Sequence, residues 1–177
     1  TGLYQNFGRA LAKRGIATAV IDYRLHPKAT LREQLSDVGA AAGFIKANAA
    51  KYKIDASQIY LAGHSAGGHL ALMESWSQKS TVSQGAIALS PILDIAHMRS
   101  AKDKDFNESL TVPFFGNGEH DMQHSPVSYA TAGALPALLL FGENDDEYLL
   151  QHPVIGPWLD RLQFFEVFSS FWFTAIY

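Results

Sequence analysis

The chain has 177 residues, of which 47% are hydrophobic and 18% are charged, and its formal net charge is −3. This composition is ordinary for one globular domain with a sizeable core, and it gives no basic footprint for nucleic acid. No run of 18 apolar residues occurs, so no membrane span is expected, and the lack of cysteine excludes disulfides and thiolate chemistry. The composition identifies neither the compartment nor the oligomeric state.

Helical and strand patterns alternate along most of the chain. Leu3, Phe7, Ala10 and Leu11 share one helical face, and Gly15 is a typical end for that helix. An apolar stripe between residues 31 and 52 and the run 66–76 predict two further helices. Apolar runs of strand length occur at residues 16–22, 58–63, 85–90 and 136–142. This alternation predicts an α/β fold with parallel strands.

Residues 91–135 interrupt this alternation with scattered proline, glycine and charge around Phe114 and Phe115. Long irregular segments in compact α/β domains are often functional, so we expect a lid or substrate loop there. A polar surface excursion without a role is the alternative.

Residues 63–67 read Gly-His-Ser-Ala-Gly, a G-x-S-x-G pattern between a predicted strand and a predicted helix. In this context the pattern predicts a strained turn that presents the hydroxyl of Ser65 as a nucleophile. We expect glycine at positions 63 and 67 because side chains there would collide with neighbouring backbone. The N–H of Ala66, at the start of the helix, is the expected oxyanion donor. The alternative is that Ser65 is only a small residue at a crowded turn.

Five segments carry a resemblance to a known family, and they occur in that family's order: "IDYRLHP", "IYLAGHSAGGHLALM", "LSPILD", "SPVSYA" and "LPALLLFGENDDE". From about residue 3 to about residue 162, the chain resembles the α/β-hydrolase esterases and lipases. The nearest branches are the hormone-sensitive-lipase-like and feruloyl-esterase-like carboxylesterases, with kynurenine formamidase as a relative. The resemblance implies a three-layer α/β/α core over residues 1–162, with a mostly parallel sheet. It also implies hydrolysis of small-molecule carboxylic esters through an acyl-enzyme on Ser65, without a cofactor or metal.

The order of the triad in this fold is serine, acid, histidine. The acid is expected after the strand at 136–142, and similarity to the family's G-x-x-D pattern selects Asp145. Asp146 is the second choice, while Glu143 and Glu147 would sit off the expected position. A solvated acidic turn is the competing interpretation.

The base of the triad is missing from the place where the resemblance puts it. That place is residues 168–177, which contain no histidine, and Trp172 stands roughly where the histidine would be. His152 follows Asp145 by only seven residues and is a poor candidate for the base.

The remaining histidines are not expected to supply the base. His64 and His69 lie in the turn and the helix after it, where structural roles are expected, and His26 and His97 fall in loops. His120 and His124 flank Asp121 with metal-like spacing, but this segment does not read as a helix, and we assign no metal site.

Both ends of the chain depart from the family pattern. The chain begins just past the point where relatives carry a His-Gly-Gly oxyanion loop. Seven of its last 14 residues are aromatic, which makes residues 163–177 an atypical tail with a possible last strand. We therefore expect a fragment or frameshift product with little activity, or else a degenerate homologue. Two further functions remain open: an aryl formamide or amide hydrolase, suggested by Gln151 after the acidic turn, and a non-catalytic binding protein.

Overall fold

The computed structural model describes residues 2–77, 80–102 and 104–141, which fall into two units. The first unit contains residues 1–20 and 142–177, and the second contains residues 21–141. In the first unit, α1 (Gly2–Ala12) is followed by Gly15 at a φ of 81°. The N–H of Ile16 bonds to the carbonyl of Leu11 across this turn, so the predicted helix and its glycine end are confirmed.

The segment after α1 corrects one prediction, because residues 16–22 form no strand. Residues 16–25 run as a loop, with Ile16 50% exposed and Val20 42% exposed. A strand needs a neighbour that accepts and donates its backbone hydrogen bonds, and none of the described strands pairs with these residues. The apolar run alone was therefore insufficient to specify a strand.

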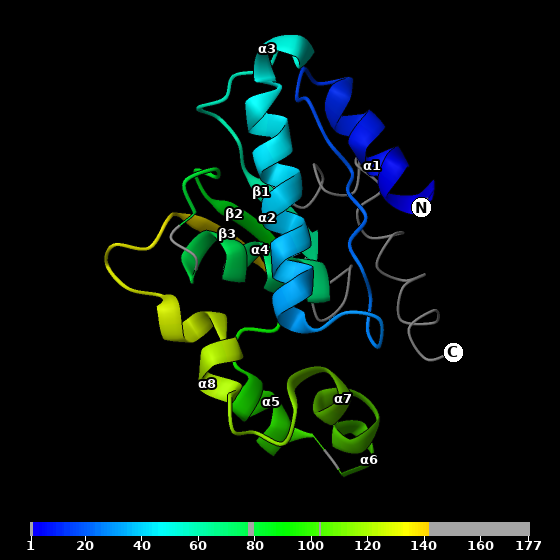
Figure 1. Ribbon diagram of the computed structural model, residues 1–177, viewed down its shortest axis with the longest axis vertical. Helices are drawn as coiled ribbons and strands as arrows, with labels where there is room; N and C mark the ends of the chain where they lie inside the picture. The colour runs from blue at the N-terminus through cyan, green and yellow to red at the C-terminus, as the bar shows by residue number, and fades with distance from the viewer. Residues whose placement is uncertain (1, 78–79, 103, 142–177) are drawn as a thin grey trace, which may run out of the picture. The chain divides into compact units, whose positions relative to one another are not determined.

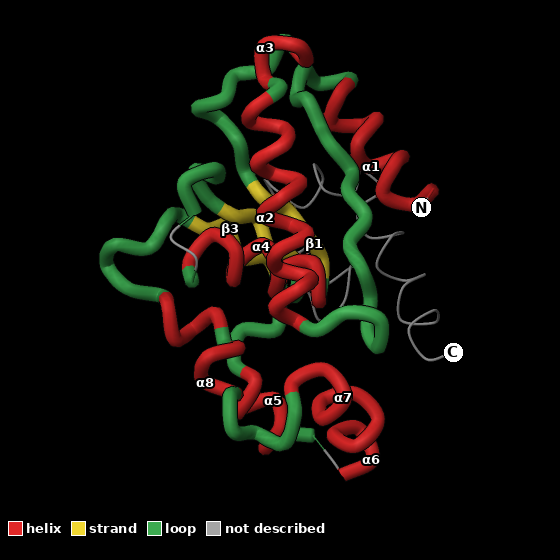
Figure 2. Tube along the Cα trace, in the orientation of Figure 1, coloured by secondary structure: helices red, strands yellow, loops and turns green. Residues whose placement is uncertain are grey.

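Three strands form a parallel sheet in the order of the sequence (Figure 2). They are β1 (Leu61–His64), β2 (Ala86–Leu89) and β3 (Ala137–Leu140). Gly63 is opposite Ala88, and Ala88 is opposite Leu139. The strands predicted at 58–63, 85–90 and 136–142 are thus confirmed, each as four residues, although β1 begins three residues later and ends one residue later than predicted.

Two helices cover one face of the sheet (Figure 1). The crossover from β1 to β2 contains α4 (Ala66–Trp76), whose Ala71 and Leu72 pack on Ala86 and Ala88. The helix α2 (Leu31–Ala47) packs on α4 through Leu35 and Val38, which contact Leu70 and Met73, and Leu61 of β1 packs against the same cluster. Ala62 and Leu138 point to the other face and are exposed within the described residues. Two of the three predicted layers are therefore seen.

The N-terminus of α2 is fixed by a capping box. The Thr30 hydroxyl accepts a hydrogen bond from the Glu33 N–H, and the Glu33 carboxylate accepts one from the Thr30 N–H at 2.8 Å. The predicted helix over 31–52 divides at Asn48, after which α3 (Ala49–Tyr52) ends at Lys53 in the left-handed region.

Residues 91–135 are more regular than the sequence suggests. They contain α5 (Ile95–Ala101), α6 (Lys104–Phe106), η1 (Asn107–Thr111), α7 (Val112–Phe115), α8 (Asp121–His124) and η2 (Pro126–Tyr129). Arg99 of α5 binds Asp121 of α8 through two bonds of 2.8 Å, and this pair holds the two helices together. The Ser125 hydroxyl donates to the Asp121 carbonyl and accepts from the Ile95 N–H. Polar bonds between residues 22 and 30 positions apart therefore organise the segment in place of one long amphipathic helix.

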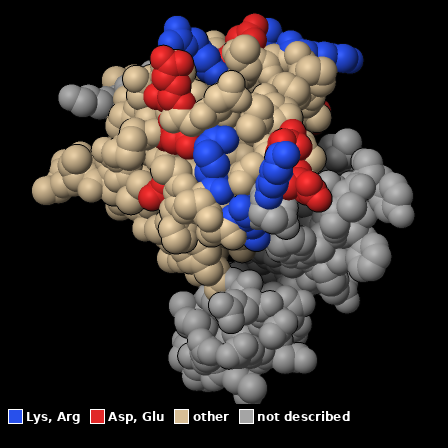
Figure 3. Space-filling model, turned by 90° about the horizontal axis from the view of Figure 1, so that it is seen from below, with Lys and Arg blue, Asp and Glu red and all other residues tan. Residues whose placement is uncertain are grey.

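The surface bears charges of both signs. On the face seen in Figure 3, Lys and Arg side chains are interspersed with Asp and Glu side chains. None of the helices in the described ranges is long and apolar enough to cross a bilayer.

Candidate active site

Ser65 occupies the turn between β1 and α4 and adopts a strained backbone conformation. Its φ is 51° and its ψ is −117°, a combination that costs a residue with a Cβ roughly 1–3 kcal/mol. The Ser65 N–H donates to the Leu89 carbonyl at 2.8 Å, so β2 holds the turn in place. The strained strand-to-helix turn predicted from the sequence is therefore present.

The glycines around Ser65 allow helix and strand to approach closely. A Cβ on Gly63 would lie 2.3 Å from the carbonyl carbon of Gly67, a distance that no side chain tolerates. The prediction of a backbone collision is thus confirmed at Gly63. At Gly67 it is wrong, because a Cβ there would meet nothing within 4 Å. The second close approach belongs instead to Gly68, whose Cβ would lie 3.0 Å from the Gly63 carbonyl oxygen. The two consecutive glycines at 67 and 68 are the sequence feature that could have indicated this close approach.

The start of α4 provides hydrogen-bond donors beside Ser65. Ala66 is the first residue of α4 and is exposed, and the first N–H groups of a helix have no partner within it. The first turn of α4 contains no acidic residue. This leaves the positive end of the helix dipole available to a negative charge that develops next to Ser65.

His64, which precedes Ser65, and His69, four residues after it, differ in burial. His64 is half-buried, and its burial lowers its pKa. His69 is 2% exposed, and its Nδ1 lies 2.9 Å from the Ile92 carbonyl oxygen, so this nitrogen carries the proton. Burial lowers the pKa of His69 to about 4, although the bond to Ile92 opposes this effect. The neutral, enclosed ring fits the structural role predicted for His69.

Ser90 is a residue of this edge that sequence reasoning missed. It follows β2 directly, has a φ of 43°, and donates its N–H to the Leu140 carbonyl at 2.7 Å. Since His64 is opposite Leu89, Ser65 and Ser90 directly follow the ends of their strands at the same edge of the sheet. The sequence signal was a serine directly after the neighbouring strand, in "LSP".

His120 and His124 lie close together, at the N-cap and the last residue of a short helix that the sequence did not predict. Their ring centroids are 6.0 Å apart, and α8 covers Asp121–His124. The carboxylate of Asp121 forms an ion pair with Arg99. The described residues contain no group of three side chains suited to a metal ion.

The acid half of the predicted site lies outside the described residues. This applies to Asp145, Asp146, Glu143, Glu147, Gln151, His152 and the tail 163–177. The structure thus brings together Gly63, Ser65, Ala66 and Gly67, and it does not test their pairing with an acid.

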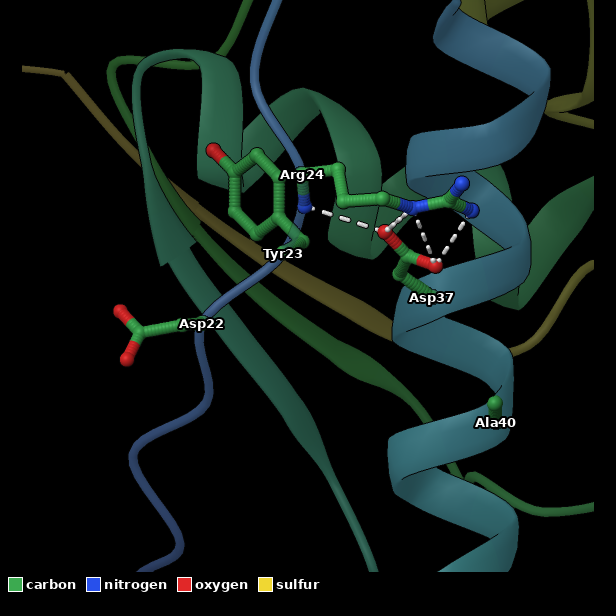
Figure 4. Close-up of a pocket in the computed structure, with 5 residues that line it drawn as sticks. All are labelled: Asp22, Tyr23, Arg24, Asp37 and Ala40. Carbon is green, nitrogen blue, oxygen red and sulfur yellow. Dashed lines mark hydrogen bonds and ion pairs between the residues drawn. The ribbon is translucent and has the colours of Figure 1, made fainter. Parts of the chain in front are cut away.

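A cavity of about 540 Å³ beside α2 does not contain the nucleophile (Figure 4). It is lined by Asp22, Tyr23, Arg24, Asp37 and Ala40. The Asp37 carboxylate accepts hydrogen bonds from both the backbone N–H and the guanidinium of Arg24, and this pairing lowers the pKa of Asp37. These contacts attach the segment 22–24 to α2, which is a structural role.

Comparison with known proteins identifies the family of most of the chain. A model of the BD-FAE family matches residues 1–152, and a model of the ResB-like family matches residues 140–177, which include the aromatic tail. The probable carboxylic ester hydrolase LipM of Mycobacterium tuberculosis is 28% identical over 151 residues, which are 76% of this chain and 35% of LipM. Isoprenylcysteine alpha-carbonyl methylesterase of Arabidopsis thaliana is 28% identical over 165 residues, with 78% of this chain and 37% of the relative covered. The chain thus spans little more than a third of these relatives.

Solved structures agree in fold. Inhibited esterase B of Lactobacillus rhamnosis matches with a TM-score of 0.67 at 23% identity, over 94% of this chain and 56% of that protein. The thermophilic esterase Est2 of Thermogutta terrifontis matches with a TM-score of 0.61 at 23% identity, over 78% and 52%. Together with the match over residues 1–152, these likenesses show that the chain belongs to the BD-FAE family of esterases and contains part of the α/β-hydrolase fold.

Proposed function

We propose that this chain carries the nucleophile of a carboxylic ester hydrolase, and that Ser65 forms the acyl-enzyme. The strained Ser65 turn at the start of α4 is the observation on which the proposal depends. Strain of this kind is concentrated at functional sites, and at Ser65 it coincides with the unpaired N–H groups at the start of α4. The ester hydrolases among the relatives support the same reaction.

Each group at the turn has a place in this reaction. The Ser65 oxygen attacks the ester carbonyl, and the Ala66 N–H donates a hydrogen bond to the oxygen that becomes negative. Collapse of this intermediate breaks the bond to the ester oxygen, which leaves as the alcohol with the proton removed from Ser65. The acyl group stays on Ser65, and water then releases it as the acid. Asp145 would orient the histidine that takes the serine proton. No histidine follows His152 in the sequence, so the proton transfer lacks its usual acceptor in this chain.

The segment 91–135 is the proposed substrate loop of this enzyme. It follows β2, so it starts from the same edge of the sheet as Ser65, and it is fixed internally by the Arg99–Asp121 pair. Residues 1–162 would be the hydrolase part, and residues 163–177 a tail that belongs to a different sequence family, which the match over 140–177 supports.

Labelling with a fluorophosphonate probe in the presence of imidazole tests this proposal. Imidazole in solution can replace the missing base, so the labelling rate at Ser65 is expected to rise with imidazole concentration. Ser65→Ala should abolish labelling, whereas Ser90→Ala, a control at the neighbouring strained serine, should leave it unchanged. If Ser65→Ala were labelled like the original chain, or if saturating imidazole produced no labelling, the proposal would be wrong.

The two other functions raised by the sequence predict different results. A non-catalytic binding protein would not be labelled under any of these conditions. An aryl formamide hydrolase would be labelled but, with imidazole, would cleave an N-formyl aromatic amide faster than the matching phenyl ester.

A further inference from the structure

A second cavity lies between the loop after residue 25 and the short helix α7. Its volume is about 560 Å³, which is in the range of small-molecule sites. Its walls include His26 and Pro27 from the loop before α2 and Arg32 from the first turn of α2. Phe114, Phe115 and His124 of the 91–135 segment complete these walls. All of these residues belong to one unit, so the cavity is defined within it.

Aromatic rings form a continuous wall of this cavity. The ring of His26 lies 4.9 Å from that of Phe114 with an interplanar angle of 41°. Phe114 in turn contacts Phe115 at 6.4 Å, and Phe115 contacts His124 at 6.3 Å. Phe114 remains 40% exposed, although burial of a phenylalanine is favourable. An apolar ring in the cavity would cover this exposed surface.

The lining of the cavity also contains a positively charged residue. Arg32 lines it, and no Asp or Glu residue does. None of the ion pairs among the described residues includes Arg32. Arg32 also lies close enough to His124 to lower its pKa, although burial of His124 is the larger cause. Because the pKa of His124 is lowered, its ring is mostly neutral at pH 7, and Arg32 is the charged group of the lining, with no carboxylate beside it among the lining residues.

The nearest carboxylate on this end of α2 is already engaged. Glu33 accepts hydrogen bonds from the N–H and hydroxyl of Thr30 at 2.8 and 2.9 Å, and it lies 3.6 Å from Arg24. It cannot turn toward Arg32 without breaking the capping box. Glu33 also offsets the positive end of the α2 dipole, so the positive charge at the cavity comes from Arg32.

We propose that this cavity binds a small aromatic carboxylate, with the ring against Phe114 and the carboxylate on Arg32. The ligand could be a free aromatic acid or the acid end of an ester that keeps a second, free carboxylate. The chemistry of recognition is the same for both. Binding does not require Ser65 to be a nucleophile, so it can succeed or fail independently of the proposed hydrolysis.

Binding to the full chain is measured by calorimetry at pH 7 and low salt with four probes. Benzoate has the ring and the charge, benzyl alcohol only the ring, acetate only the charge, and monomethyl terephthalate is an ester with a free carboxylate. Benzoate is expected to bind roughly tenfold more tightly than benzyl alcohol or acetate, because only benzoate uses both walls. Tighter binding of monomethyl terephthalate than of benzoate would identify the ester as the better ligand, and the reverse would identify the free acid.

Paired variants separate the two walls. Arg32→Gln should weaken benzoate roughly tenfold and leave benzyl alcohol unchanged, while Phe114→Leu should weaken both about threefold. The matched controls are Lys51→Gln at the other end of the α2–α3 pair and Phe44→Leu on the exposed face of α2, and both should bind like the original chain. Ser65→Ala should also bind normally.

Three results would overturn the proposal. The first is no binding of benzoate at roughly 10 mM, a concentration at which even a ligand with a millimolar Kd occupies most sites. The second is equal affinity for benzoate and benzyl alcohol. The third is an equal loss of benzoate affinity in Arg32→Gln and Lys51→Gln. Circular dichroism of each variant verifies that a loss of binding does not come from a loss of folding.

Discussion

Gly63 and Gly67 face each other across the turn that carries Ser65, but only one of them needs to be glycine. A Cβ on Gly63 would overlap the Gly67 carbonyl group, whereas a Cβ on Gly67 would enter open space. The two glycines of the G-x-S-x-G pattern therefore have different physical reasons to be there.

Gly63→Ala should destabilise the fold far more than Gly67→Ala. The clash at Gly63 is with backbone and cannot be relieved by a side-chain rotation, so we expect a loss of about 3 kcal/mol or more. Gly67 lies in α4 without a positive φ, so alanine there should be neutral or stabilising by up to about 1 kcal/mol. Urea unfolding of both variants checks this, and equal losses would contradict the structural explanation.

His69 should make stability depend on pH in a window between about 6.5 and about 4. Above this window the ring is neutral in both the folded and the unfolded chain. Within it the unfolded chain binds a proton that the buried ring, with its pKa lowered to about 4, does not bind. The free energy of unfolding should therefore fall as the pH falls, by at most roughly 3 kcal/mol.

Two variants isolate this dependence on His69. His69→Gln keeps a donor for the Ile92 carbonyl but cannot titrate, so its stability should change less between pH 6.5 and 4. His97→Gln removes an exposed histidine and should keep the original slope. Urea unfolding at several pH values measures both slopes, and identical slopes would exclude His69 as the cause.

Loss of the Arg99–Asp121 pair should lower the free energy of unfolding more than loss of the exposed Lys104–Glu108 pair of the same segment. Asp121 is buried, and Asp121→Asn leaves the guanidinium of Arg99 without its carboxylate, so we expect a loss of about 1–3 kcal/mol. Glu108→Gln breaks an exposed pair with Lys104 and should cost no more than about 0.5 kcal/mol. Thermal unfolding compares the two, and a larger effect at Glu108 would contradict this ranking.

Ester turnover by the 177-residue chain should be very low without added imidazole. Loss of one member of a triad removes most of the catalysis that the triad provides. With a short-chain nitrophenyl ester, kcat/KM should be roughly 10⁴-fold or more below that of a complete esterase assayed alongside. Comparable turnover would show that another group takes the proton from Ser65.

The sequence was most informative where a residue's neighbours along the chain determine its conformation. The strained turn at Ser65 and the helix that follows it depend on adjacent residues and on the strand directly before them. Residues 16–22 were mispredicted because strand formation depends on a partner elsewhere in the chain, which an apolar run does not reveal. The reason for Gly67 was wrong because the close contact is formed by the next residue, Gly68.

The 91–135 segment shows a different limit of pattern reading. Its helices are one or two turns long, too short for an apolar period to emerge, and their arrangement depends on Arg99 and Asp121, which are 22 positions apart. The ring wall around Phe114 likewise joins His26 to residues that follow β2. Phe114 and Phe115 stood out in the sequence, but the contact of Phe114 with His26 did not.

The order of the strands has a consequence for how the sheet assembles. β1 and β2 are joined by residues 65–85, whereas β3 reaches β2 only after residues 90–136. The entropy lost when a loop closes rises with its length, so β1, α4 and β2 should associate before β3 is added. Trp76 donates its indole N–H to the Leu135 carbonyl at 2.8 Å, so its fluorescence should change late in refolding, when β3 arrives.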